Sequence, residues 1–182
     1  MSEFYKGKIL ISNSSIITDD FNKSVVFMMD HDSTGAFGLV INKKSLIYIS
    51  ELVTQLPKTI HDSEVYWGGP VDMSFVSILH NKSNLKEPGI EIIKGVFLSR
   101  SYEVLLDLLT SSDNKYHIFQ GYSGWGAGQL ESEFLRKSWV SHEASSDIIF
   151  SQNPETVWRE ALRSKGGIYK YFAEHTKDPL LN

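Results

Sequence analysis

The residues whose types and spacing point most directly to chemistry lie in the stretch GYSGWGAGQLESEF, residues 121–134. A strand followed by glycines and a helix N-terminus offers backbone N–H groups and a positive dipole end to an anion. The glycines at positions 121, 124, 126 and 128 fit neither the dinucleotide fingerprint nor the phosphate loop. No lysine or arginine lies between Gly121 and Arg136, and Glu131 and Glu133 are expected in the first helical turn, where they would repel a phosphate. The pattern therefore favours a structural corner over an anion cradle.

A second group of chemically capable residues is the run Asp30-His31-Asp32, whose three side chains are all metal ligands by type. Neighbours on a strand point to opposite faces, so all three reach one ion only if the turn begins there. A polar hairpin loop with capping aspartates is the favoured interpretation. His80 also ends a predicted strand, and the sequence leaves open whether it meets His31. The other histidines show no ligand spacing, so no metal site is predicted.

Nucleophile motifs are equally weak. Ser123 lies in a sequence similar to a nucleophile elbow, but residues 121–125 do not match G-x-S-x-G. A serine beside glycine is usually a turn residue. A carboxylate such as Glu131 could act as a general acid or base, but the sequence does not identify a partner for it. No catalytic residue is therefore assigned. The alternative that stays open is a hydrolase or metal-assisted enzyme using His31, His80 and nearby carboxylates.

Apolar patterning and turn residues outline the elements that must position these groups. We expect strands at residues 8–11, 24–29, 37–42, 65–67, 75–80, 90–93, 96–98 and 117–121, with a hairpin loop of several residues at DHDSTGA. Helices are predicted at 50–56, 102–109, 129–137 and after Asn153, a candidate cap followed by Pro154. Strands and helices do not alternate strictly, which indicates a single α+β domain over residues 1–182, with residues 172–182 as a frayed tail.

Composition excludes several classes of function. The chain has 182 residues, 18 Lys and Arg against 22 Asp and Glu, and a net charge of -4. No basic run is longer than Lys43-Lys44, so the concentrated basic face of a nucleic-acid binder is missing from the sequence. It has no cysteine, which removes disulfides and thiolate chemistry. It shows neither a secretion signal nor an apolar run long enough to span a bilayer, so we expect a cytoplasmic protein without a membrane partner.

Taken together, these blocks resemble the AlgH/YqgE family of bacterial proteins. The similarity runs through GKILIS, SVVFMMDHDSTGAFGLVIN, VYWGGPV, IFQGYSGWGAGQLESEF, Trp139 and VWREAL, in the order that the family has them. Ala127 departs from the proline that the family often has. The resemblance implies one α+β domain with a mixed, bifurcated, partly barrel-like sheet flanked by helices. It implies little chemistry, and the label of transcriptional regulator carried by some members finds no helix-turn-helix or basic patch here.

These observations predict a non-enzymatic binding or regulatory protein, with at most an indirect role in transcriptional regulation and no cofactor. Loops on a rigid scaffold usually carry function, so the expected surface combines the 121–131 segment, the 68–70 turn and the 30–35 hairpin. Its partner is an unidentified protein or small molecule, and direct nucleic-acid binding ranks last. The predicted binding residues are His31, Gly35, Asn42, Gly68, Gly69, Pro70, His80, Tyr122, Ser123, Gly124, Trp125, Gln129 and Glu131.

Overall fold

Strand β9 (Tyr116–Gly126) is the element around which the fold is built. The computed structural model describes residues 4–13, 20–58, 60 and 62–175. The first half of β9 pairs in parallel with β5 (Glu64–Trp67), and its second half pairs antiparallel with β3 (Gly35–Val40). Along its other edge runs β6 (Val71–His80), also antiparallel. Because two strands share one edge of β9 in succession, the sheet divides there into two branches.

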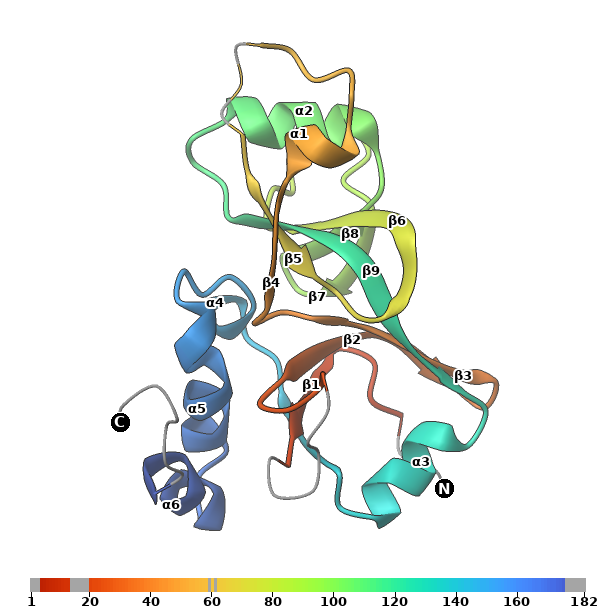
Figure 1. The fold of residues 1–182 in the computed structure, drawn as a ribbon, viewed down its shortest axis with the longest axis vertical. Helices are drawn as coiled ribbons and strands as arrows, with labels where there is room; N and C mark the ends of the chain where they lie inside the picture. The colour runs from red at the N-terminus through yellow and green to blue at the C-terminus, as the bar shows by residue number, and fades with distance from the viewer. Residues whose placement is uncertain (1–3, 14–19, 59, 61, 176–182) are drawn as a thin grey trace.

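The two branches are stacked along the long axis of the molecule (Figure 1). The lower branch has the strand order β10-β1-β2-β3-β9, and its pairs are all antiparallel. The upper branch continues β9-β6-β8-β7, with β4 paired to β5. The strands not yet bounded are β1 (Lys8–Ser12), β2 (Val25–Asp32), β4 (Lys44–Tyr48), β7 (Ile90–Ile93), β8 (Val96–Ser99) and β10 (Trp139–Glu143).

Six helices in the described part of the chain cover the curled sheet. The upper branch carries α1 (Ile49–Leu52) and α2 (Tyr102–Thr110), and α3 (Gln129–Leu135) lies beside the end of β9 (Figure 1). The group α4 (Ser146–Ile149), α5 (Pro154–Lys165) and α6 (Ile168–His175) lies along the side of the lower branch. The sheet curls into a half-barrel. The prediction of a single α+β domain with a mixed, bifurcated, partly barrel-like sheet is confirmed.

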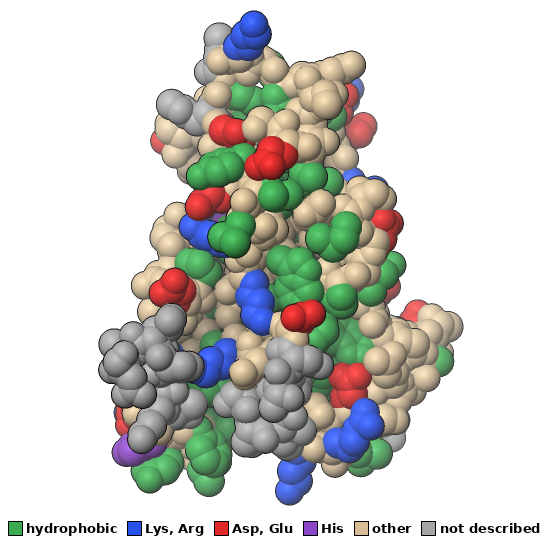
Figure 2. Space-filling model, viewed as in Figure 1, with side chains coloured by type: hydrophobic (Ala, Val, Ile, Leu, Met, Phe, Trp, Pro, Cys, Tyr) green, Lys and Arg blue, Asp and Glu red, His purple; other side chains and the backbone are tan. Residues whose placement is uncertain are grey.

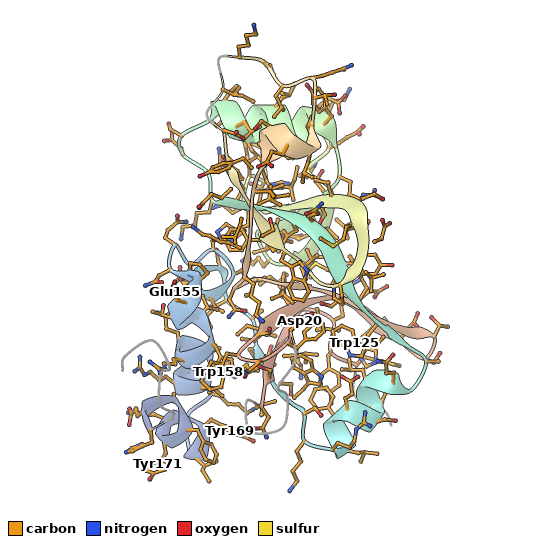
Figure 3. All side chains as sticks on the ribbon, in the orientation of Figure 1. Asp20, Trp125, Glu155, Trp158, Tyr169 and Tyr171 are labelled. Atoms are coloured by element: carbon orange, nitrogen blue, oxygen red, sulfur yellow. The ribbon has the colours of Figure 1, made fainter. Side chains whose placement is uncertain are left out.

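The lower branch is buried on both faces, which explains why its strands read as continuous apolar runs rather than alternating ones. Ile9, Ile11 and Phe27 join the central core under α4 to α6, whereas Leu10 and Val26 join the lower core, which faces α3. Figure 3 shows Trp158 of α5 and Trp125 of β9 on the two sides of this branch. The upper core lies between the upper sheet and α2, and consists of Ile49, Val65, Ile78, Val104, Leu105, Leu108, Leu109 and Ile118.

Several boundaries differ from the sequence prediction. The expected hairpin loop is a tight turn, because β2 continues to Asp32 and β3 begins at Gly35, with Asp32 Oδ1 accepting a 2.7 Å hydrogen bond from Thr34 N–H. The helix expected at 50–56 is the single turn α1. Asn153 makes no side-chain cap, although Pro154 does open α5. The tail predicted from residue 172 overlaps α6 as far as His175, and residues 176–182 lie outside the described residues.

The largest correction concerns the glycine-rich stretch. Residues 121–126, expected as a corner, are the second half of β9 and pair with β3 from Gly35 to Gly38. The corner is confined to Ala127 and Gly128, and Gly128 adopts a left-handed conformation just before α3. Tertiary pairing thus overrides the low strand propensity of glycine.

Candidate functional site

The predicted glycines cluster where β9 crosses β3 and the β5–β6 turn, and their role is close packing. A Cβ on Gly68 would lie 2.3 Å from the Gly121 carbonyl oxygen, and one on Gly69 would lie 2.3 Å from the Tyr122 carbonyl carbon. A Cβ on Gly35 would lie 2.4 Å from the Trp125 carbonyl oxygen. We call this point the glycine crossing. Its backbones touch, so these glycines position the neighbouring side chains and leave no cradle for a ligand.

The side chains of three other predicted residues also make their contacts inside the protein. Ser123 is 1% exposed, and its hydroxyl donates a 3.0 Å hydrogen bond to the Gly68 carbonyl across the glycine crossing. The Asn42 side chain accepts a 2.7 Å bond from Val25 N–H and donates to the Lys23 carbonyl. Tyr122 packs edge-on against Phe37 and Phe75. Each of these side chains therefore holds two segments of the fold together.

His31 is 5% exposed, and both of its ring nitrogens have partners. Nδ1 accepts a 3.1 Å hydrogen bond from Tyr5 N–H, and Nε2 lies 3.1 Å from Glu131 Oε1. Because Nδ1 is an acceptor, a neutral ring carries its proton on Nε2 and donates it to the Glu131 carboxylate. Asp30 and Asp32 point outward on either side of it, as strand alternation predicts. His31 and Glu131 thus connect β2, α3 and the N-terminal segment.

His80 lies far from His31. It pairs with Tyr116 at one end of β9, whereas His31 pairs through Ala36 with Trp125 near the other end. Nine residues separate these two positions on β9 (125 − 116), which at roughly 3.3 Å each is about 30 Å of strand. The His80 ring is fully buried, with Nε2 2.8 Å from the Pro88 carbonyl oxygen and Nδ1 accepting from Lys82 N–H. Burial lowers the pKa of His80, opposed by its bond to Pro88.

One site containing both histidines is therefore not formed. Within the part of the chain that the structure describes, no group of three or more His, Asp or Glu side chains could hold a metal ion. The hypothesis of a hydrolase or metal-assisted enzyme relied on both histidines. His31 is hydrogen-bonded to Tyr5 and Glu131, whereas His80 is hydrogen-bonded to Pro88 and Lys82. The predicted surface is consequently divided, and its residues Pro70, Gly124, Trp125 and Gln129 line a cavity.

That cavity, which we call the Trp125 pocket, has a volume of about 410 Å³. It lies beside the start of α3, and Figure 3 marks the position of Trp125. Trp125 comes from β9, Pro70 from the β5–β6 turn, and Trp139 from β10, so three distant segments build its walls. Its lining residues are Phe21, Pro70, Gly124, Trp125, Gln129, Glu133, Arg136, Ser138 and Trp139.

Glu133 fixes the aromatic wall of this pocket. Its Oε2 accepts hydrogen bonds of 2.9 and 2.7 Å from the indole N–H groups of Trp125 and Trp139. Its Oε1 accepts a 3.1 Å bond from the Gln129 amide. The two indole rings meet edge to face, with centroids 6.1 Å apart. Hydrogen bonds to an ionised acceptor are stronger than neutral ones, so both indoles are preorganised.

Arg136 brings an available positive charge to the pocket. It follows the last residue of α3 and is exposed, and its guanidinium makes no hydrogen bond or ion pair with any residue that the structure describes. A guanidinium binds a carboxylate or phosphate in a bidentate manner. The pocket therefore combines flat apolar walls with one anion-binding group.

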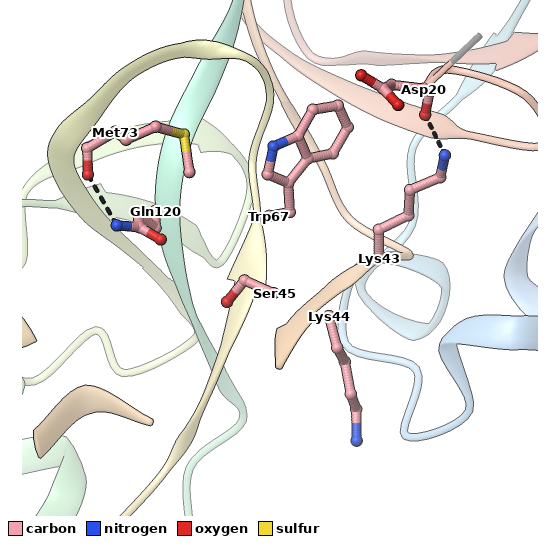
Figure 4. Close-up of a pocket in the computed structure, with 7 residues that line it drawn as sticks. All are labelled: Asp20, Lys43, Lys44, Ser45, Trp67, Met73 and Gln120. Carbon is pink, nitrogen blue, oxygen red and sulfur yellow. Dashed lines mark hydrogen bonds between the residues drawn. The ribbon is translucent and has the colours of Figure 1, made fainter. Parts of the chain in front are cut away.

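A second pocket lies on the other side of Phe21, whose ring centroid is 5.8 Å from that of Trp139 and 5.7 Å from that of Trp67. We call it the Lys43–Trp67 pocket, and its volume is about 330 Å³. It is lined by Asp20, Lys43, Lys44, Ser45, Trp67, Met73 and Gln120 (Figure 4).

Sequence reasoning missed most of the residues in both pockets. The sequence argument used Arg136 and Glu133 only for their effect on a phosphate, and Trp139 only as part of the family resemblance. The signals available were the pair of basic residues Lys43-Lys44 and the position of Trp67 directly before the glycine turn. Neither signal shows that residues from β4, β5 and β9 meet, because that proximity is created by the branching of the sheet.

Sequence comparison with known proteins identifies relatives of this chain. The model of the family described as DUF179, AlgH-like, matches residues 9–170. The chain belongs to this family. UPF0301 protein CT0663 of Chlorobaculum tepidum is 32% identical over 179 residues, covering 97% of this chain and 95% of the relative. A UPF0301 protein of Cytophaga hutchinsonii is 34% identical over 182 residues, with 97% and 98% covered.

Solved structures show the same fold. The solution structure of the AlgH protein from Pseudomonas aeruginosa aligns with a TM-score of 0.75 and 27% identity, covering 98% of this chain and 100% of that one. The crystal structure of DIP2367 from Corynebacterium diphtheriae aligns with a TM-score of 0.77 at 17% identity, covering 94% and 93%. The similarity to DIP2367 concerns the fold alone.

Proposed function

We propose that this chain is a non-enzymatic binding protein whose ligand occupies the Trp125 pocket. The observation that carries the proposal is the rigid wall formed by Trp125 and Trp139 on Glu133, beside the Arg136 guanidinium, which pairs with none of the described residues. Binding sites typically combine apolar walls with a few placed polar groups. Here the Glu133 carboxylate is used by its three donors, so the ligand meets aromatic surface and one cation.

The matching ligand has a flat apolar part and a carboxylate. The apolar part would contact Trp125, Trp139 and Phe21, and the carboxylate would pair with Arg136. A side chain or C-terminus of a partner protein has this chemistry, and so does a small organic acid. The pocket is large enough for either, because about 410 Å³ lies within the range of ligand sites, roughly 300–1,000 Å³.

The internal bonds of the acid–base candidates support binding rather than catalysis. His31 is bonded to Tyr5 and Glu131, and Ser123 donates to the Gly68 carbonyl. A nucleophile needs an adjacent base, and a base needs reach to a substrate proton. Neither arrangement occurs at these residues.

In the cell, we place the protein in the cytoplasm, acting on its targets through a bound partner. No helix in the described part of the chain is both long and apolar enough to cross a membrane. On the face in Figure 2, Lys and Arg side chains are dispersed among acidic ones and form no continuous basic patch. We propose that any influence on transcription is indirect, because the chain carries a net charge of -4 and nucleic-acid affinity depends on concentrated positive charge.

The test is a thermal-shift screen with aromatic and aliphatic carboxylic acids, accompanied by affinity capture of protein partners. A ligand at a hundred times its Kd stabilises the folded state by about 2.7 kcal/mol, which is measurable. Arg136→Gln should weaken binding of a hit or captured partner about tenfold. Lys94→Gln is the matched control, because Lys94 is an exposed lysine on the β7–β8 turn and its loss removes the same charge.

Two results would contradict the proposal. One is a screen in which no acid raises the melting temperature and no protein is captured. The other is equal binding by the wild type and the Arg136→Gln variant.

A further inference from the structure

The Lys43–Trp67 pocket contains polar groups that the Trp125 pocket does not explain. Lys43 directly precedes β4, Trp67 ends β5, Gln120 lies in the middle of β9, and Met73 belongs to the curved first half of β6 (Figure 4). The backbone N–H of Trp67 donates a 2.8 Å hydrogen bond to the Lys43 carbonyl. The base of the pocket is thus held by the sheet rather than by loops.

Trp67 differs from the other three tryptophans in the state of its indole N–H. Two of the others donate to the Glu133 carboxylate, and Trp158 donates a 2.9 Å hydrogen bond to the Ser12 carbonyl. The indole N–H of Trp67 has no acceptor among the residues described. A sheltered indole N–H usually has a partner, so the Trp67 donor is available to a ligand.

Hydrogen-bond acceptors lie near this donor. Figure 4 shows the Trp67 indole nitrogen on the side of the ring nearest Met73 and Gln120. Gln120 Nε2 donates a 2.9 Å hydrogen bond to the Met73 carbonyl, which turns Gln120 Oε1 toward Trp67 (Figure 4). The Ser45 hydroxyl donates a 2.8 Å bond to the Val65 carbonyl and retains its own lone pairs. The pocket therefore presents a donor with acceptors beside it.

The two lysines of the pocket are engaged by the protein. Lys43 Nζ donates to the Asp20 backbone carbonyl, and Lys44 pairs with the Glu64 carboxylate. Figure 4 shows the two ammonium groups pointing in opposite directions, and it shows Asp20 on the other side of the Trp67 ring from the acceptors. The groups that remain for a ligand between Trp67 and the acceptors are uncharged. The pocket therefore suits a neutral ligand.

The side chain of Met73 supplies an apolar wall opposite Trp67. Figure 4 shows its thioether turned toward the Trp67 ring across the pocket, and Met73 is 43% exposed. A thioether is polarisable and makes favourable contacts with aromatic rings. A flat ring placed between Met73 and Trp67 would therefore gain apolar contact while its edge reaches the donor and the acceptors.

We propose that the Lys43–Trp67 pocket binds a small uncharged aromatic molecule that carries an amide edge, in which a C=O group lies next to an N–H group. The C=O accepts the Trp67 indole proton, and the N–H donates to Gln120 Oε1. Carboxamides and ring lactams have this edge. The volume of about 330 Å³ is near the lower limit of ligand sites, which fits a molecule of one or two rings.

This site goes beyond the proposed function. The Lys43–Trp67 pocket and the Trp125 pocket have no lining residue in common, and their ligands differ in charge. Each site can therefore be tested while the other is intact.

The test is an NMR titration of the ¹⁵N-labelled full chain with benzamide, nicotinamide, uracil and hypoxanthine. The chain has four tryptophans, and the indole resonance that disappears in Trp67→Phe belongs to Trp67. At least one compound should bind saturably at millimolar concentration or below and shift the Trp67 indole resonance the most. An analogue without the N–H, N,N-dimethylbenzamide or 1,3-dimethyluracil, should bind about tenfold more weakly than its parent.

Gln120→Met removes the acceptor and keeps a side chain of similar length, so it should weaken binding about tenfold. Arg136→Gln in the Trp125 pocket should leave this binding unchanged, so failure at one site is distinguishable from failure at the other. The melting temperature shows whether Gln120→Met folds, and the methylated analogues decide the matter on the wild type if it does not. The proposal is overturned if no compound shifts the Trp67 indole resonance, if a methylated analogue binds as well as its parent, or if folded Gln120→Met binds as the wild type does.

Discussion

At the scale of single residues, His117 is the group whose environment most constrains its protonation. It lies in β9, stacked on Tyr66 with ring centroids 4.2 Å apart, and its Nδ1 has no partner among the described residues. Burial, and to a lesser degree the charge of Lys44, lowers the pKa of His117 to about 4 from an ordinary value of 6.5. The folded protein therefore keeps this ring neutral in mildly acidic solution.

This depressed pKa predicts acid sensitivity. Between pH 6.5 and 4 the unfolded chain binds a proton on His117 that the folded chain does not, so stability falls as the pH falls through this window. The stabilisation that comes from the neutral His117 ring is fully present above pH 6.5. At pH 4 the free energy of unfolding is lower by about 3 kcal/mol, at 1.36 kcal/mol per pH unit. His117→Phe keeps an aromatic ring on Tyr66 and cannot titrate. Urea unfolding at pH 7 and pH 4 should show a drop about 3 kcal/mol smaller in the variant, and equal drops would refute the assignment.

Glu133 is the residue on which the Trp125 pocket depends. Glu133→Gln removes the charge that strengthens the bonds from Trp125 and Trp139, and it presents an amide group to Gln129. We expect a loss of about 1–3 kcal/mol in the free energy of unfolding, together with a change in tryptophan fluorescence. Glu174→Gln on the exposed face of α6 is the control for charge alone. Unchanged stability and emission in Glu133→Gln would show that the carboxylate does not organise the indoles.

The chemical types of these residues could be predicted from the sequence, but their partners could not. Glu131 lies in the first turn of α3, as predicted, whereas Glu133 lies one turn further along the helix. Their actual partners are His31, 100 positions away, and two tryptophans from different strands. Such contacts arise from how β2, β9 and β10 are brought together, and no local pattern encodes them.

At the scale of elements, the glycine crossing depends on the absence of a side chain where backbones touch. Gly68→Ala would put a Cβ 2.3 Å from the Gly121 carbonyl oxygen and 2.9 Å from Leu39. Because those neighbours belong to β9 and β3, the strands must separate, at a cost of about 3 kcal/mol or more. Gly126→Ala is the matched control, since it lies in β9 with nothing within 4 Å of the added carbon. Chemical denaturation should show a large loss for Gly68→Ala and less than about 1 kcal/mol for Gly126→Ala; similar losses would disprove the packing role.

The same crossing explains where the element prediction succeeded and failed. Apolar runs located most strands and the helices α2 and α5, because burial imposes periodic patterns that survive in the sequence. The second half of β9 was missed because its glycines carry no such pattern. They are required by close approach to β3 and to the 68–70 turn, which is visible only when those segments lie together.

At the scale of the whole molecule, β9 joins two branches that share the central core, whereas the lower core and the upper core each belong to one branch. The α+β class followed from the order of elements, whereas the branched and curled form of the sheet was implied by family resemblance alone. Physical reasoning could not locate the branch, because parallel pairing of β5 with β9 connects residues that are about 50 positions apart in the chain. That branch separates His31 from His80 and creates the two pockets beside Phe21.

A shared strand should also make the two branches unfold together. All four tryptophans, at 67, 125, 139 and 158, lie outside the upper core, so their fluorescence reports on the lower part of the molecule. Leu108 of α2 is fully buried in the upper core, and Leu108→Ala should remove about 2–5 kcal/mol there. If β9 couples the branches, the urea midpoint seen by tryptophan fluorescence shifts as far as the midpoint seen by circular dichroism. Leu135→Ala, at a side chain 85% exposed, should shift neither. A fluorescence midpoint that stays in place while the dichroism divides into two transitions would show instead that each branch folds on its own core.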